Sequence, residues 1–217
     1  MTRRGDATRE RIVDVAERLY AARGVDGVSL REIRIEAGQR NVSALQFHFG
    51  DRDGLLRAIA ERHLPRIDAV QERIAAQLAD TAASDEGTRV RQHLAVLVRP
   101  AAEYLALGPS ERAWVQIAAQ LAALPTLTSE DLLAHLTPAA LDHGTALFEH
   151  LRPTLGDHLA AERLFAVGTS SLHLCADRAR IEDAGGATRP LLALAQFADN
   201  LLDMAVGALL APVGPPA

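Results

Sequence analysis

Apolar side chains recur every three or four residues along most of the chain, which is the period of an amphipathic α-helix. Segments with this spacing cover residues 7–23, 89–107, 114–124, 129–153 (interrupted near Pro138), 158–176 and 190–210. No stretch alternates apolar and polar residues, as a half-buried strand would. The pattern predicts an all-α fold, with a loop over residues 177–188, where Gly185 and Gly186 stand together.

Signals for a second, short helix follow the first one. Ser29 and Glu32 have the spacing of a capping box, in which each side chain caps the other residue's backbone N–H. Val28 and Ile33 occupy the two apolar positions that pack together at such a start. Gly38 is a typical residue just beyond a helix end, so this helix is predicted to be short.

A third helix is predicted over 42–49, with Asn41 as its N-cap and Gly50 as its stop. Another helix starts at Asp51. Pro65 predicts a kink or break in it, because proline has no N–H to donate and its ring crowds the preceding turn.

Two short helices joined by a turn, after a longer first helix, are typical of a helix-turn-helix DNA-binding unit. There the second helix is braced on the DNA backbone and the third enters the major groove. Leu45 and Phe49 are four residues apart and can face the core. The outer side is then formed by Val42, Ser43, Gln46 and Phe47. An ordinary helical bundle has the same pattern, so periodicity alone leaves both interpretations open.

Charge is distributed unevenly between the first 50 residues and the rest. Every basic residue is an arginine, and residues 1–50 hold nine of them against seven acidic residues, a balance of +2. The other 14 arginines stand against 21 acidic residues, a balance of −7, and the two parts sum to −5. A pI near 5.9 argues against a protein that coats nucleic acid without selectivity. Any DNA binding is expected on a small N-terminal face.

Residue types that bind metals or carry catalysis are present, but not in the patterns that those functions need. The eight histidines include no His-Glu-x-x-His sequence and no clustered Cys and His spacing; His143 and His150 are simply two helical turns apart. The single cysteine, Cys175, excludes an internal disulfide and suits a reducing compartment. Gly168-Thr-Ser170 lacks the second glycine of a nucleophile elbow. We expect no metal, no cofactor and no enzymatic activity.

The most apolar stretch, residues 190–211, contains Gln196, Asp199, Asn200 and Asp203, which argues against a membrane span. No apolar segment follows the N-terminal Met-Thr-Arg-Arg, so nothing marks secretion. A cytoplasmic protein without a membrane partner is expected.

Residues 8–59, TRERIVDVAERLYAARGVDGVSLREIRIEAGQRNVSALQFHFGDRDGLLRAI, resemble the DNA-binding domain of the TetR (tetracycline repressor-like) family of bacterial regulators. The matching features, in chain order, are Ala16–Tyr20, Gly24, Ser29–Ile33, Ala37-Gly38 and Leu45–Leu55. Three features depart from the family pattern: one extra residue between Gly38 and Asn41, Arg34 at a commonly small position, and Phe47 where many relatives carry an aromatic residue with a hydroxyl.

The resemblance implies a homodimer, with residues 1–52 as the helix-turn-helix domain and residues 53–217 as a helical ligand-binding and dimerisation domain. It further implies a transcriptional regulator, most often a repressor, that binds a palindromic double-stranded DNA operator and is released by a small-molecule inducer. The residues that match the family's DNA contacts are Ser29, Leu30, Arg31, Asn41, Val42, Ser43, Ala44, Gln46, Phe47, His48 and Arg52.

The chemistry of these residues suits DNA. Arg31 and Arg52 can bind phosphate oxygens, Gln46 can pair with adenine, and Ser43 can reach a base edge or a phosphate. Each also has a structural alternative: Arg52 can be a solvated charge, and His48 a core histidine.

The C-terminal part offers weaker candidates. The resemblance places the inducer pocket among the helices that carry Tyr104, Arg112, Trp114, His143 and Phe148, although core filling explains the large rings as well. Two apolar stripes with small residues predict a dimer interface like a four-helix bundle, with an ordinary intrachain core as the alternative. They contain Leu164, Gly168 and Leu172, and Leu191, Leu194, Ala198, Leu201 and Ala205.

Two other functions remain open at this point. One is an all-α small-molecule sensor or adaptor that has lost DNA binding, which the extra turn residue and Phe47 favour. The other is a helical enzyme, for which the sequence holds no recognisable motif.

Overall fold

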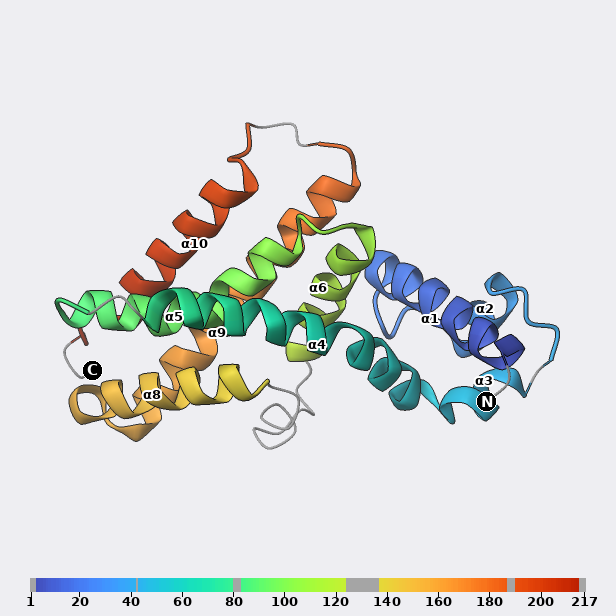
Figure 1. Cartoon of the computed structure of the whole chain (residues 1–217), viewed down its shortest axis with the longest axis horizontal. Coiled ribbons are helices and arrows are strands. Elements are labelled where there is room, and N and C mark those ends of the chain that lie inside the picture. The colour runs from blue at the N-terminus through green and yellow to red at the C-terminus, as the bar shows by residue number, and fades with distance from the viewer. Residues whose placement is uncertain (1–2, 42, 80–82, 124–136, 187–189, 215–217) are drawn as a thin grey trace.

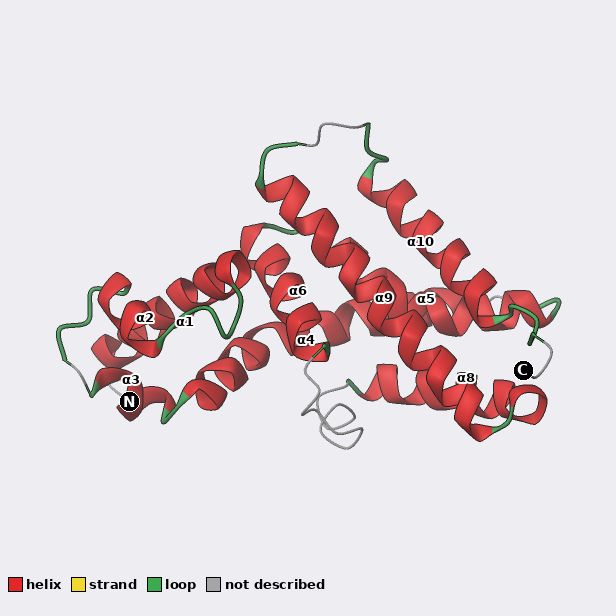
Figure 2. Ribbon diagram, turned by 180° about the vertical axis from the view of Figure 1, so that it is seen from behind, coloured by secondary structure: helices red, strands yellow, loops and turns green. Residues whose placement is uncertain are grey.

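The computed structural model describes residues 3–41, 43–79, 83–123, 137–186 and 190–214, and confirms an all-α fold, since no strand occurs within these ranges (Figure 2). The helices are α1 (Arg3–Arg23), α2 (Leu30–Glu36), α3 (Ala44–Phe49), α4 (Arg52–Ala79), α5 (Glu86–Tyr104), α6 (Pro109–Ala122), α8 (Pro138–Leu155), α9 (Asp157–Asp183) and α10 (Leu194–Leu209). The helix start predicted near residue 129 lies outside the described residues.

Helices α1, α2 and α3 form a small head at one end of the molecule, and α4 runs from it into the body (Figure 1). The head has an apolar core because the three- and four-residue spacing of α1 turns one face inward. The buried residues there include Ile12, Ala16, Tyr20, Ile33 and Leu45.

The predicted start of α2 is confirmed. Ser29 Oγ accepts a hydrogen bond from Glu32 N at 3.2 Å, and Ser29 N donates to a Glu32 carboxylate oxygen at 2.8 Å. Val28 and Ile33 are both fully buried beside this cap. Gly38 follows with φ of +67°, a left-handed conformation that a residue with a Cβ rarely adopts, so the chain can turn sharply towards α3.

Two predicted helix boundaries are wrong in the first half of the chain. Asn41 is not the N-cap of the third helix, which begins at Ala44 after Ser43; Asn41 instead accepts a hydrogen bond from Ser43 N at 3.0 Å and shapes the turn. Of the kink or break predicted at Pro65, the break is wrong, because α4 continues to Ala79; the kink stays a prediction. Buried residues on both sides of the proline, His63 and Ile74 among them, hold the helix together by tertiary packing.

The predicted loop over residues 177–188 is also wrong for its first part, because α9 continues to Asp183. This last stretch is polar on its exposed side, yet Ala179 is fully buried and Arg178 is paired with Glu182 at 2.6 Å. The polar composition of residues 177–183 favoured a loop in the sequence prediction, although these residues form two more turns of α9.

In the body, α5 packs against α4, α8 and α10, while α6 packs against α9. Figure 1 shows α5 between α10 and α8. Ala198, Leu201 and Ala205 of α10 are buried within the single chain, where α10 packs against α5 and α9; their assignment to a dimer interface stays a prediction. Leu164 and Leu172 of α9 and Leu194 of α10 are half-buried against the same core. Leu191, before α10, is half-buried, and Gly168 is exposed.

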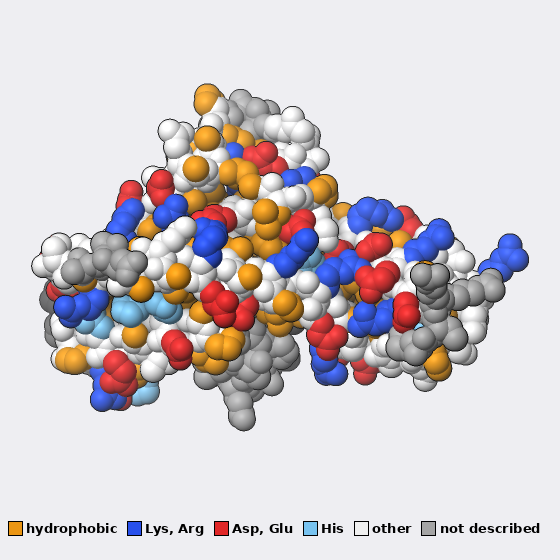
Figure 3. All heavy atoms as spheres, viewed as in Figure 1, with side chains coloured by type: hydrophobic (Ala, Val, Ile, Leu, Met, Phe, Trp, Pro, Cys, Tyr) orange, Lys and Arg blue, Asp and Glu red, His pale blue; other side chains and the backbone are white. Residues whose placement is uncertain are grey.

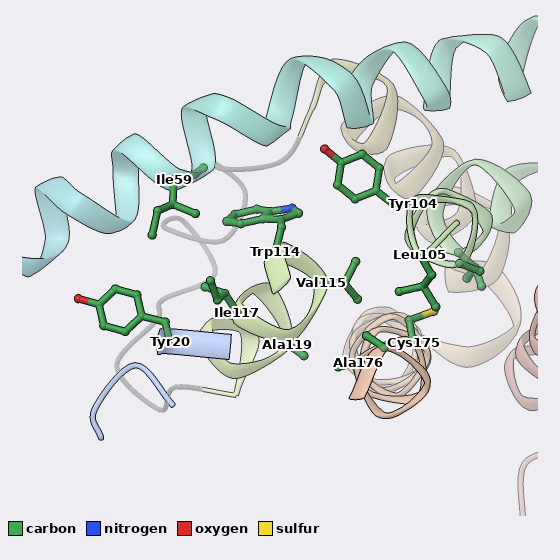
Figure 4. Close-up of a cluster of buried hydrophobic side chains, with 14 of the residues drawn as sticks. Tyr20, Ile59, Tyr104, Leu105, Trp114, Val115, Ile117, Ala119, Cys175 and Ala176 are labelled. Carbon is green, nitrogen blue, oxygen red and sulfur yellow. The ribbon is translucent and has the colours of Figure 1, made fainter. Parts of the chain in front are cut away.

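A buried polar cluster joins the head to the body. His63 of α4 is 1% exposed, and its Nε2 donates to the carboxylate of Glu17 on α1 at 2.9 Å. Its Nδ1 lies 2.9 Å from the hydroxyl of Tyr104 on α5, and its ring stacks on Trp114 of α6 at 5.3 Å. Figure 4 shows Tyr104 and Trp114 lying beside α4.

The Glu17 carboxylate remains charged in this buried setting. Burial by itself raises the pKa of Glu17, but hydrogen bonds from His63 and Ser110, with the positive charge of Arg62, outweigh burial and lower it. Four helices thus meet at one buried cluster whose polar groups are hydrogen-bonded to one another.

Candidate nucleic-acid interface

One face of the α3 helix packs into the head, and the opposite face is exposed to solvent. Leu45 and Phe49 are buried in the head, as predicted, whereas Ser43, Gln46 and Phe47 are exposed. Ala44 is only 8% exposed, so its small side chain packs into the head; its direct contact with DNA stays a prediction.

Three polar side chains near α3 have no partner in the part of the chain that the structure describes. These are Arg31 on α2, Arg40 in the turn and Gln46 on α3; each is exposed, and none makes a hydrogen bond or ion pair with another described residue. Ser43 likewise makes no capping bond with its side chain. Unpaired cations and amides around an exposed helix are the groups that contact phosphates and base edges.

Arg40 was missed by the sequence prediction. The signal for it was simple: an arginine next to the glycine turn that joins the two short helices. Its neighbour Arg34, by contrast, donates to the Gln39 carbonyl at 2.8 Å and so stabilises the turn. This hydrogen bond ties the end of α2 to the turn that holds the extra residue.

Several residues that were predicted to contact DNA interact instead with other residues of the head. The Ser29 hydroxyl is used by the capping box, and Leu30 is half-buried against the core. Arg52 donates to Asp26 and to the Val28 carbonyl, both at 3.1 Å. Its guanidinium fixes the turn before α2, which is a structural role that the sequence did not reveal.

His48 and Phe47 form a small aromatic cluster at the end of α3. The His48 ring meets Phe47 edge-on, with centroids 5.2 Å apart, and lies 6.0 Å from the buried Phe49. His48 is half-buried, and Asn41 is exposed in the turn. Val42 lies outside the described residues.

Charges of both signs are mixed over the head rather than separated. Figure 3 shows arginine and acidic side chains interspersed there. Several of these arginines are paired, such as Arg18 with Glu36 at 2.6 Å and Arg23 with Glu32 at 2.7 Å. Among the described residues, the unpaired arginines of the head include Arg31 and Arg40 beside α3, and also Arg11 on α1 and Arg57 on α4.

The five ligand-binding candidates do not come together. Tyr104 and Trp114 are buried around His63, and Phe148 packs against the core. Arg112 is paired with Asp183 at 2.5 Å, while His143 Nδ1 lies 3.0 Å from His93 Nδ1 on α5. Burial lowers the pKa of both His93 and His143, and the neighbouring charge of His143 lowers that of His93 further.

A groove of about 620 Å³ lies elsewhere, between α1, α6 and the end of α9. Glu17, Ser110 and Gln116 are among its lining residues, and it contains none of the five candidates. Within the described ranges, no three histidine, cysteine or acidic side chains are arranged to hold a metal ion. Nor does any described helix have the length and apolar character to cross a membrane.

An exposed short helix, braced by a capped helix on a three-helix head, defines a helix-turn-helix DNA-binding protein. Residues 12–59 match the model of a family described as bacterial regulatory proteins, tetR family. This match covers the head and the start of α4, so the head is a tetR-type DNA-binding domain.

Solved structures with a similar fold include a bacterial regulatory protein of the tetR family from Rhodococcus RHA1, with 15% identity and a TM-score of 0.50, covering 96% of this chain and 98% of that one. A gamma-butyrolactone receptor (ArpA-like protein) has 22% identity and a TM-score of 0.42, covering 94% and 98%. A TetR-family transcriptional regulator from Pectobacterium atrosepticum has 23% identity and a TM-score of 0.40, covering 96% and 94%. No curated protein sequence matches the chain.

Proposed function

We propose that this regulator is a ligand-responsive repressor that binds a two-fold symmetric DNA operator as a homodimer and is released by a small molecule. The observation that carries the proposal is the exposed outer face of α3, flanked by the unpaired Arg31 and Arg40. It acts where bacterial DNA is, in the cytoplasm, and the proposal includes no catalytic reaction.

The DNA contacts divide into two kinds. Arg31 and Arg40 bind phosphates and set the orientation of the head. Because neither guanidinium is paired with another described residue, no internal ion pair has to be broken when it binds a phosphate. Ser43 and Gln46 reach base edges in the major groove, where a glutamine amide matches the donor and acceptor of adenine.

Dimerisation uses the exposed side of α9. Phe165 is 51% exposed, and it lies on one helical stripe with Gly168 and the half-buried Leu172. Nothing lies within 4 Å of the point where a Cβ of Gly168 would stand, so a second helix has room to approach. A symmetric pair of such faces gives an isologous interface and hence two heads for one operator.

Regulation passes from the body to the head through the His63 cluster. A ligand that moves α5 or α6 displaces Tyr104 or Trp114, and these side chains contact the histidine that donates to Glu17 of α1. Two binding sites coupled in this way affect each other equally, so operator binding must weaken ligand binding by the same factor. The division into residues 1–52 and 53–217 describes this arrangement, with α4 shared between the two parts.

The test begins with recovery of genomic fragments on the immobilised full-length protein, in parallel with an Arg31→Ala/Arg40→Ala/Gln46→Ala variant whose helical content is checked by circular dichroism. We expect the wild type to enrich a small set of fragments that the variant does not retain. Release of those fragments is then screened against a panel of small molecules. Equal recovery by both proteins, or no enrichment, would contradict the proposal.

A further inference from the structure

Among the described residues of the head, Phe47 is the most exposed large apolar side chain, with 82% of its surface open to solvent. A single exposed apolar residue is ordinary on a protein surface. This one, however, stands on the exposed side of α3, next to Gln46 and one turn after Ser43.

The position of Phe47 follows from the helix geometry. Its backbone N–H donates to the Ser43 carbonyl at 2.8 Å, so Phe47 lies one turn after Ser43 on the same side of the helix. That side is opposite the buried Leu45 and Phe49. The edge-on contact with His48, whose interplanar angle is 81°, gives the Phe47 ring a neighbour on one side.

A phenyl ring has neither a donor nor an acceptor, so Phe47 cannot hydrogen-bond a phosphate or a base edge. The apolar group that B-DNA displays in the major groove is the C5-methyl of thymine, which distinguishes thymine from cytosine. Contact with this methyl removes apolar surface from water on both partners.

We propose that Phe47 reads the C5-methyl group of a thymine in each operator half-site. Gln46 is adjacent on the same exposed side and can pair with an adenine, so the two residues together favour an A·T-containing step. The inference rests on the proposed function, since it names the base feature that the exposed face of α3 recognises.

The test uses an operator fragment recovered by the wild-type protein. Each thymine is replaced in turn by deoxyuridine, which removes the methyl and leaves the base pair intact. We expect one thymine per half-site at which the wild type loses roughly fourfold in affinity for each methyl removed, from the burial of one carbon. Phe47→Ala should lose affinity for the thymine operator and show no further loss on the deoxyuridine operator.

Phe47→Leu is the matched variant, because an apolar side chain that still reaches the methyl should keep part of the discrimination. The salt dependence of binding should be the same for wild type and Phe47→Ala, since no phosphate contact is lost. The inference is overturned if Phe47→Ala remains as sensitive to deoxyuridine as the wild type, or if its salt slope falls by about one unit. Failure of the wild type to bind any specific DNA would instead overturn the proposed function, and this inference with it.

Discussion

Arg31 and Arg52 carry the same charge but lie in different surroundings. Arg31 has no partner among the described residues, whereas Arg52 donates to Asp26 and to the Val28 carbonyl. Sequence alone gave both arginines a phosphate contact. The structure separates them, because a guanidinium held by two internal acceptors stabilises the fold, while a free one is available to DNA.

Replacing each arginine by alanine should therefore change a different quantity: DNA affinity for Arg31 and folding stability for Arg52. Arg31→Ala should weaken binding to all DNA sequences alike and lower the slope of log affinity against log salt by about one unit, with unchanged thermal stability. Arg52→Ala should cost about 1 kcal/mol of unfolding free energy, the typical net worth of a hydrogen bond. Salt-dependent DNA titrations and urea unfolding measure the two quantities. A loss of stability in Arg31→Ala would mean that Arg31 has a structural role.

Gln46 differs from the arginines because its amide can distinguish bases. Gln46→Ala should cost about 1–3 kcal/mol of binding free energy at one base position and relax the preference there. Binding to a library of operator variants measures this change. If Gln46→Ala and Arg31→Ala altered the library profile in the same way, α3 would not be the helix that reads the bases.

At the scale of elements, the capping box of α2 is tied to a titratable group. Hydrogen bonds from Arg23 and from Ser29 lower the pKa of Glu32 to about 2, from an ordinary value of 4.5. The folded protein therefore binds fewer protons at this site than the unfolded chain does between these two pH values. The stability that Glu32 contributes is present above pH 4.5 and is lost as the pH falls through about 2.

The variant Glu32→Gln isolates this contribution. It should be less stable than the wild type near neutral pH, and the difference should shrink as the pH is lowered from 4.5 towards 2. Because Glu32 is exposed, the effect should be small and should weaken further in high salt. Urea unfolding followed by circular dichroism at several pH values measures it. A difference that does not change with pH would show that the charge of Glu32 does not contribute.

Local signals in the sequence were enough to predict the elements of the head. The capping box at Ser29, the turn at Gly38 and the inward pair Leu45 and Phe49 depend on neighbours within a few residues. The boundary errors have a different origin. The continuity of α4 through Pro65 is secured by packing against other helices, which the local sequence does not contain.

The candidate site was predictable only in part, for the same reason. An exposed outer side of α3 follows from helical periodicity. The burial of Ala44 and the commitment of Arg52 to Val28 and Asp26 depend on how the head packs. The apolar stripe of α10 was equally suited to an intrachain or an interchain partner, and its packing against α5 depends on the whole fold rather than on the local sequence.

At the scale of the whole molecule, a new charge should have different effects at a buried apolar position and at an exposed one. Ala198 is 2% exposed inside the chain, and Phe165 faces solvent on α9. Ala198→Glu should destabilise the fold by about 3 kcal/mol or more, because it buries an unpaired charge. Phe165→Glu should leave the fold intact but yield a monomer with weak operator affinity, since each interface charge is repeated across the two-fold axis.

Sedimentation and circular dichroism distinguish these outcomes. Asp199 and Asp203 lie on the exposed side of α10 and pair with Arg99 and Arg91 of α5, so Asp203→Asn serves as a mild control on the same helix. If the Ala198→Glu variant were folded but monomeric, the dimer interface would lie on α10 instead. A fully dimeric Phe165→Glu would place the interface away from α9.

The most direct test of the central claim is footprinting of the full-length protein on its recovered DNA. One reading helix per chain and a symmetric dimer predict two protected half-sites related by a two-fold axis, with centres separated by about 10–10.5 base pairs or a multiple of it. Protection of a single asymmetric site, or uniform protection without sequence preference, would contradict the claim that paired α3 helices read an operator.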